Sequence, residues 1–144
     1  MTTVLLAWAC WILLQAGRAL AVPFTHRNAA GPVTNGLVVV VPRLAREMCT
    51  SAELAALVAH EHGHIACGHA AKNFVLRCFF VPRTVARVEA QEFEADDFAA
   101  TQCDPLILCE ALRRLSFNDL DWKRAKRLER IAVARRALHQ LATA

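Results

Sequence analysis

The chain of 144 residues has little glycine, and this scarcity limits the kinds of structure that it can form. Only five residues are glycine, whereas alanine and leucine are abundant, so helices should dominate the fold. Hydrophobic residues make up 56% of the chain and charged residues 21%, a balance that excludes a disordered protein. The length suffices for one domain with a modest core.

The sequence also lacks the cysteine spacings of common metal and redox sites. None of its six cysteines forms a Cys-x-x-Cys pair, and nothing in their spacing requires a disulfide framework. We therefore expect free thiols that are mostly buried and that pack as small hydrophobic side chains.

The positive charge is concentrated near the C-terminus, in a stretch that has no aromatic residues interleaved with the basic ones. The formal net charge is +4, and the basic residues of this stretch are Lys123, Arg124, Lys126, Arg127, Arg130, Arg135 and Arg136. Proteins that bind single-stranded nucleic acid combine basic side chains with aromatic rings on which the bases stack. The stretch is interpreted instead as the solvated face of a helix, and no nucleic-acid partner is expected.

The apolar run at residues 4–14 lacks the preceding basic residue that a secretory signal peptide normally carries. Arg18 interrupts the run before it reaches the roughly 20 apolar residues that a membrane span needs. The small residues Ala19 and Ala21 nevertheless resemble a cleavage site. Residues 1–21 therefore have three interpretations: a first helix of the domain, a signal sequence, or an anchor that gives the protein a membrane partner. The predicted location is correspondingly cytoplasmic or membrane-associated.

A short strand is predicted after the N-terminal segment. Residues 37–41 are apolar and largely β-branched, which favours a strand. The pair Asn35-Gly36 precedes them and favours a hairpin turn. The partner strand should lie either at residues 22–25 or near Val33.

The clearest predicted helix begins at Thr50. Thr50 and Glu53 have the spacing of a capping box, in which each side chain satisfies a backbone donor of the first turn. Apolar residues then recur at helical spacing as far as Gly68, which marks the end of the helix. Further helices are predicted at residues 70–80, 84–101, 106–115 and 122–141. The predicted fold class is α+β, a mostly helical domain with a small β-sheet packed on the helix that begins at Thr50.

That helix contains a His-Glu-x-x-His motif, formed by His60, Glu61 and His64. Residues four apart lie on one face of a helix, so the two imidazoles can bind one metal ion. Glu61 lies beside the first histidine, within reach of a water on that ion. Zinc lowers the pKa of such a water toward neutrality, and the carboxylate accepts its proton. The motif therefore predicts a hydrolytic centre with one Zn²⁺ per chain.

A catalytic zinc ion needs a third protein ligand and an open coordination position. Glu92 and Asp96 lie on a later predicted helix and are four residues apart, so their carboxylates face the same way. One can bind zinc while the other accepts the imidazole N–H of a ligand histidine. Glu94 points to a different face. An ordinary charged helix surface is the alternative interpretation, but the position about thirty residues after His-Glu-x-x-His favours the zinc site.

Together these motifs resemble the HtpX-type gluzincin peptidases, a family that also includes the CAAX prenyl endopeptidases and the compact minigluzincins. Upstream of the first motif, the chain follows the family order as well. The matching segments are Asn28-Ala29, residues 37–41 and 51–59, His60-Glu61-x-x-His64, His69, and Glu92-x-Glu94-Ala95-Asp96.

The resemblance implies that His60, His64 and Glu92 bind the zinc ion. Glu61 would be the general base, and Asp96 would hydrogen-bond a ligand from outside the coordination sphere. The resemblance also implies that the strand at residues 37–41 lies along the cleft and pairs with an extended substrate backbone. His69 matches a family position and is assigned no catalytic role.

The C-terminal part of the resemblance contains one departure. The family usually has a His-Pro step shortly before a Glu-Arg-Ile segment. Arg130 lies in such a segment here and is a candidate for stabilising the oxyanion of the reaction. Arg124-Ala125 occupies the His-Pro position. Arg124 is interpreted as part of the solvated basic face, with two alternatives: it still supplies positive charge to the site, or it impairs the site.

The sequence thus predicts a zinc metalloendopeptidase that acts on polypeptide substrates, with residues 1–144 as a single metallopeptidase domain. The alternative is a zinc-binding but catalytically inactive relative that acts as a regulatory or binding module. The missing His-Pro step is the feature that would explain such a relative.

Overall fold

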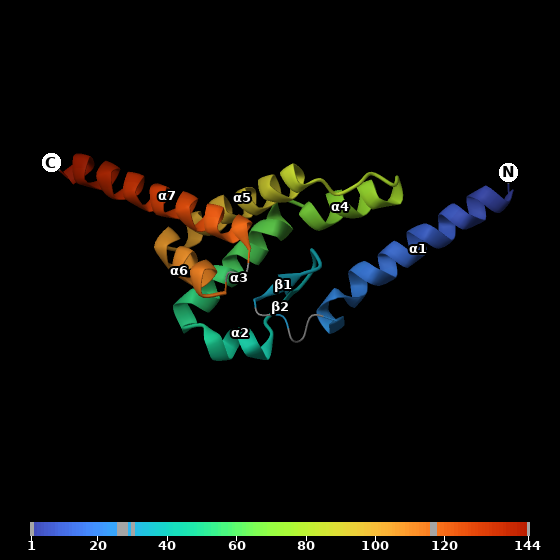
Figure 1. Cartoon of the computed structure of the whole chain (residues 1–144), viewed down its shortest axis with the longest axis horizontal. Helices are drawn as coiled ribbons and strands as arrows, with labels where there is room; N and C mark the ends of the chain where they lie inside the picture. Colours follow the sequence, from blue (N-terminus) through green and yellow to red (C-terminus); the bar gives the residue numbers. More distant parts are fainter. Residues whose placement is uncertain (1, 26–28, 30, 116–117, 144) are drawn as a thin grey trace.

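The computed structural model describes residues 2–25, 29, 31–115 and 118–143, so Asn28 of the family resemblance lies outside the described part. The helices are α1 (Thr2–Thr25), α2 (Arg43–Met48), α3 (Ser51–Ala66), α4 (His69–Cys78), α5 (Val85–Gln102), α6 (Pro105–Leu115) and α7 (Asp119–Thr143). The strands are β1 (Val33–Thr34) and β2 (Val39–Val40). The prediction of a mostly helical α+β fold is therefore confirmed (Figure 1).

The two strands form the predicted hairpin, and the partner of residues 37–41 lies near Val33 rather than at residues 22–25. β1 and β2 are antiparallel, with Val33 opposite Val40. The Asn35 side chain shapes the turn, because its Oδ1 accepts the backbone N–H of Leu37 at 3.0 Å. Gly36 has a φ of 92°, a conformation that glycine adopts without strain.

Helix α3 begins and ends as the sequence predicts. Thr50 and Glu53 form the complete capping box: each side chain bonds the other residue's backbone N–H. At the other end, Gly68 has a left-handed φ of 66° and separates α3 from α4. The short helix α2, which precedes α3, was not predicted. The two ends of α3 thus set its length, and His60 and His64 lie on one face of the helix between them.

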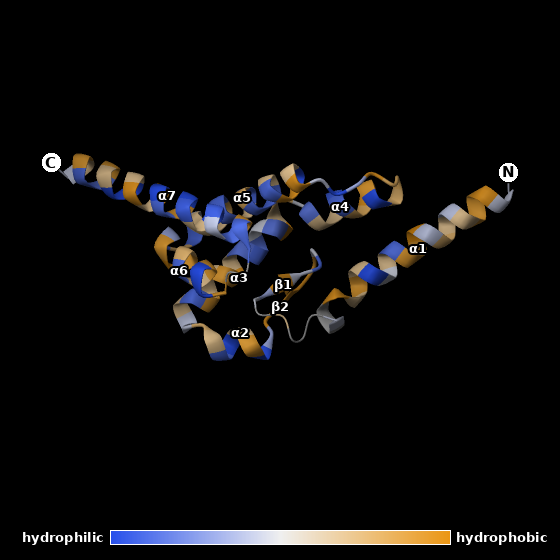
Figure 2. Ribbon diagram, viewed as in Figure 1, coloured by the Kyte–Doolittle hydropathy of each residue, from blue (hydrophilic) through white to orange (hydrophobic). Residues whose placement is uncertain are grey.

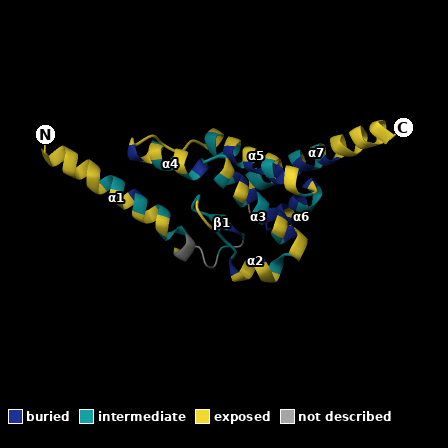
Figure 3. Cartoon of the chain, turned by 180° about the vertical axis from the view of Figure 1, so that it is seen from behind, coloured by how far each residue is buried: buried dark blue, intermediate teal, exposed yellow. Residues whose placement is uncertain are grey.

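The core lies between α3, α5, α6 and α7. Its buried residues are Ala56, Leu57, Ala99, Ala100, Leu108, Cys109, Ala111, Leu112, Leu115, Ala125 and Leu128. The outer ends of α1 and α7 point away from this core in opposite directions and are exposed (Figures 1 and 3). All six cysteines are free, as predicted, but only Cys78 and Cys109 are buried, so the expectation that most of them are buried is wrong.

Gly63 allows α3 to approach α5 closely. A Cβ atom at this position would lie 2.8 Å from both the backbone Cα and the carbonyl oxygen of Ala95. Neither atom belongs to a flexible side chain, so any larger residue would force the two helices apart. The close approach matters because α3 carries the histidine pair and α5 carries the carboxylates.

Replacing Gly63 with alanine is therefore expected to lower the free energy of unfolding by about 1–3 kcal/mol, the usual cost of overpacking a well-packed contact. Urea unfolding followed by circular dichroism measures the change. Gly17→Ala is the matched control, because Gly17 is also helical but a Cβ atom added to it would have no neighbour within 4 Å. Equal stability of the Gly63 and Gly17 variants would contradict the close contact.

Candidate metal centre

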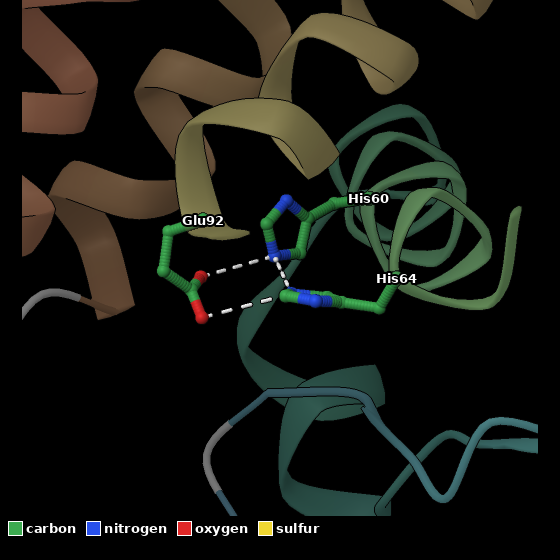
Figure 4. A group of neighbouring side chains, drawn as sticks. All are labelled: His60, His64 and Glu92. Carbon is green, nitrogen blue, oxygen red and sulfur yellow. Dashed lines mark hydrogen bonds and ion pairs between the residues drawn. The ribbon is translucent and has the colours of Figure 1, made fainter. Parts of the chain in front are cut away.

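Three potential metal ligands from two helices meet at one point (Figure 4). The Nε2 atoms of His60 and His64 lie 3.1 Å apart on the shared face of α3. From α5, the Glu92 carboxylate lies 3.3 Å from His60 Nε2 and 3.6 Å from His64 Nε2. Ligands that bind one ion tetrahedrally at about 2.0 Å are themselves about 3.3 Å apart. The three spacings match that value, so the donor set fits a zinc ion.

Asp96 bonds the His60 ring on the side away from the proposed metal position. Its Oδ1 lies 2.9 Å from Nδ1 of His60, and the aspartate is fully buried. Donation of the Nδ1 proton to this carboxylate leaves the lone pair of Nε2 facing His64 and Glu92. Burial alone would raise the pKa of Asp96, but hydrogen bonds from Arg124 and His60 outweigh that effect and lower the pKa below its ordinary value.

Glu61 lines the same cavity, which has a volume of about 720 Å³ and is bounded by residues of α1, β1 and the helices α3 to α7. Burial raises the pKa of Glu61 to about 7, although the nearby charge of His60 and a hydrogen bond from the Thr34 backbone oppose the rise. A carboxyl group with this pKa can both accept and return a proton near neutral pH.

Arg124 is buried beside the ligands, with 6% of its surface exposed. Its guanidinium group donates to both carboxylate oxygens of Asp96, at 2.9 Å and 2.7 Å, and lies 3.0 Å from Glu92. Its Nη2 atom is also 3.2 Å from both ring nitrogens of His60. The interpretation of Arg124 as part of a solvated face is therefore wrong, because the buried carboxylate of Asp96 and the partly buried carboxylate of Glu92 hold its charge in the interior.

The sequence profile of Peptidase family M48 matches residues 25–102, which include the hairpin, α3, α4 and α5. The chain belongs to peptidase family M48. This assignment confirms the resemblance to HtpX-like gluzincins at the level of the family. No curated protein and no solved structure matches the chain.

In this M48 chain, the structure does not bring Arg130 to the cavity. Arg130 is exposed on α7, whereas Arg124 lies on the inward face of the same helix and lines the cavity. Of the two arginines, only Arg124 lies where it would interact with a negative charge that forms in the cavity. His62, between the two ligand histidines in sequence, is exposed to solvent.

The strand that lines the cavity is β1 rather than the one expected from residues 37–41. Val33 and Thr34 of β1 contribute to the cavity wall, and among the described residues no member of β2 does. β2 pairs with β1 and supports it from the other edge. The expectation that residues 37–41 lie along the cleft is therefore wrong, because the strand in the cavity wall is their hairpin partner β1.

Two residues near the M48 site were not assigned from the sequence. His69, at the start of α4, is buried, and its Nδ1 lies 2.8 Å from Nδ1 of His64. Its Nε2 lies 2.8 Å from the Glu94 carboxylate of α5. The contact between His64 and His69 depends on the left-handed turn at Gly68. Because the sequence does not reveal the direction of this turn, the five-residue spacing alone could not predict the contact.

Proposed function

We propose that this M48 protein is a zinc-dependent metalloendopeptidase whose ion is held by His60, His64 and Glu92. The observation that supports this most directly is the convergence of two imidazoles and one carboxylate at tetrahedral spacing. Membership of a metallopeptidase family supports the same conclusion independently. Zinc analysis of the purified protein is expected to give one ion per chain, and a His64→Ala variant is expected to lose it.

The reaction proposed is hydrolysis of an internal peptide bond. When bound, zinc supplies a Lewis acid that polarises the scissile carbonyl and acidifies the attacking water. Glu61 accepts the proton of that water and then returns it to the leaving amine. Its raised pKa of about 7 suits both steps, because the carboxylate and carboxylic acid forms differ little in free energy at neutral pH.

The substrate proposed is an extended polypeptide segment that lies against β1. β2 occupies one edge of β1, and the cavity lies beside this strand. The Thr34 backbone also bonds Glu61, so a backbone paired with β1 would pass close to the general base. Pairing of this kind supplies affinity through main-chain hydrogen bonds and places few demands on the substrate's side chains.

An inactive zinc-binding module is the second candidate, and the position of Arg124 is the observation that favours it. The guanidinium group bonds Glu92, the third proposed ligand, and its positive charge opposes that of a zinc ion. If this opposition keeps the ion from binding substrate, the protein would bind zinc without cleaving peptides. Casein cleavage by the zinc-loaded wild type, compared with Glu61→Gln, separates the two candidates.

We also propose that α1 associates with a membrane surface as part of the single domain. α1 contains a segment of 21 residues, Thr2–Val22, with a mean hydropathy of 1.6 and 6% of it buried. Figure 2 shows apolar residues along much of this helix. Trp8 and Trp11 donate their indole N–H groups to the backbone carbonyls of Cys78 and Arg77 at 3.0 Å. A complete membrane span would carry this junction and Arg77 into the hydrocarbon, which is costly.

The interfacial location is also supported by the chemistry of the turn between α4 and α5. Phe79 and Phe80 are exposed there, next to the Trp8 and Trp11 rings. Residues 72–88 carry four basic side chains and no acidic one. Exposed apolar side chains flanked in sequence by basic ones suit the boundary between acyl chains and anionic headgroups.

Leu13→Asp is therefore expected to reduce binding to vesicles of neutral and anionic phospholipids at least tenfold, because it places a charge among the apolar residues of α1. Leu138→Asp on α7 is the matched control, since the two leucines are 71% and 67% exposed. Vesicle flotation measures both variants. Resistance of the wild type to alkaline extraction would instead indicate a complete span, and equal loss in both variants would exclude a specific role of α1.

A further inference from the structure

The two proposed histidine ligands are supported in different ways. Nδ1 of His60 bonds directly to the buried carboxylate of Asp96. Nδ1 of His64 instead faces a second imidazole, that of His69, at 2.8 Å, and His69 in turn bonds Glu94 at 2.8 Å. The His69 side chain is 3% exposed and that of Glu94 is 56% exposed. The contacts thus form a chain that leads from His64 through a buried ring to the protein surface.

The donors and acceptors along this chain can be assigned from its outer end. An ionised carboxylate can only accept, so Nε2 of His69 carries a proton and donates it to Glu94. In a neutral imidazole the other nitrogen is then an acceptor, so Nδ1 of His69 accepts. Nδ1 of His64 must therefore be the donor. This leaves Nε2 of His64 without a proton, and that atom faces His60 and Glu92.

We infer that His69 and Glu94 are positioning residues that fix the metal-binding tautomer and the ring orientation of His64. The inference rests on the proposed function, in which His64 binds zinc through Nε2. With Asp96 acting in the same way on His60, the Nε2 atoms of both histidines and the carboxylate of Glu92 present lone pairs to one point. None of the three has a proton to donate to the others, so a cation placed between them would be bound by all three lone pairs.

The same side chains also permit a different arrangement, a second metal site. Donor atoms of Cys67, His69 and Glu94 lie within 4.8 Å of one another. A metal ion bound by these three residues would replace the direct contact between His69 and Glu94, because both side chains would bind the ion. The geometry favours the hydrogen-bonded chain, because both of its bonds have ordinary lengths for such contacts. The experiment must therefore be able to detect a metal ion bound by Cys67, His69 and Glu94.

The test compares His69→Ala with His69→Asn. Alanine removes the acceptor of the His64 proton, whereas the asparagine side-chain oxygen can take the place of Nδ1. Zinc affinity, measured in competition with a chelator, is expected to fall about 10–100-fold in His69→Ala. It is expected to recover most of that loss in His69→Asn. His62→Ala is the matched control, because His62 is an exposed histidine on α3.

A proton NMR readout tests the hydrogen bond itself rather than the stability of the region. The wild type is expected to show a slowly exchanging ring N–H resonance from His64, in both zinc-free and zinc-loaded protein. This resonance should disappear in His69→Ala and return in His69→Asn. The zinc-free measurement keeps the inference testable if the wild type binds no zinc, an outcome that would sink the proposed function alone.

Three results would overturn the inference. One is unchanged zinc affinity in a folded His69→Ala variant. Another is absence of the His64 N–H resonance from the wild type. The third is binding of two ions per chain, with a thiolate-to-cobalt absorption band when Co²⁺ replaces zinc, since that band would assign Cys67 and His69 to a second metal site.

Discussion

Replacing Glu61 with glutamine is expected to lower kcat for peptide hydrolysis by about 10²–10⁴-fold while zinc remains bound. The amide has the shape of the carboxyl group but cannot accept the proton of the attacking water. Glu61 is not among the three proposed ligands, so the metal content should not change. Cleavage of unfolded casein followed over time measures the activity, and atomic absorption measures the zinc.

The matched control for this variant is His62→Ala, which changes the neighbouring exposed residue of α3. Its casein cleavage should equal that of the wild type. Full activity in Glu61→Gln would show that another group acts as the base. A wild type that holds zinc but cleaves neither casein nor a range of unfolded proteins would favour the inactive binding module. In that case Arg124→His, which restores the usual family residue, is expected to gain activity.

Removal of the Arg124 side chain is expected to have the largest effect on stability. Arg124→Ala should lower the free energy of unfolding of the zinc-free protein by about 3–5 kcal/mol, because it leaves the buried carboxylate of Asp96 and the partly buried carboxylate of Glu92 without their cation. Urea unfolding measures this difference. In zinc-saturated protein the loss should be smaller, because the ion neutralises Glu92. Arg130→Ala is the control, and its exposed position predicts a change within about 0.5 kcal/mol.

The effect of Arg124 should also depend on pH. In the folded protein, burial raises the pKa values of Asp96 and Glu92, but hydrogen bonds and the Arg124 charge lower both below their ordinary values of 3.8 and 4.5. Carboxylates with lowered pKa values stabilise the folded state above those ordinary values, and this stabilisation is lost as the pH falls below them. The difference between the wild type and Arg124→Ala should therefore be constant near neutrality and shrink below about pH 4. A difference that persists undiminished in acid would show that packing, rather than charge, is responsible.

The residues that could be predicted from the sequence are those governed by helix periodicity. His60 and His64 share a face because they are four residues apart, and the same spacing brings Glu92 and Asp96 together. The capping box and Gly68 fix the ends of α3 by local hydrogen bonds and backbone conformation, both of which depend on neighbouring residues alone. The sequence therefore predicted the proposed ligands without any knowledge of the tertiary structure.

The contributions of Arg124 and His69 could not be predicted in this way because both depend on contacts between distant elements. Arg124 lies on the inward face of α7 with Leu128 and Ala132, at helical spacing. A basic residue at such a position is normally excluded from the interior, and only the carboxylates of α5 make its burial favourable. His69 reaches His64 because of the turn at Gly68. Strand β1 was equally hard to assign to the cavity wall, because its two residues are too few to give a strand pattern.

The bonds of Arg124 have a consequence for the order in which the protein matures. In many small zinc proteins, the free energy of metal binding drives folding, so the chain folds only when the metal arrives. Here an internal guanidinium group balances Asp96 and Glu92 before any ion is present, and the helices that carry the ligands are held by an apolar core. Folding is therefore expected to precede metal binding, so the zinc-free chain should be a folded precursor whose proposed activity begins when zinc binds.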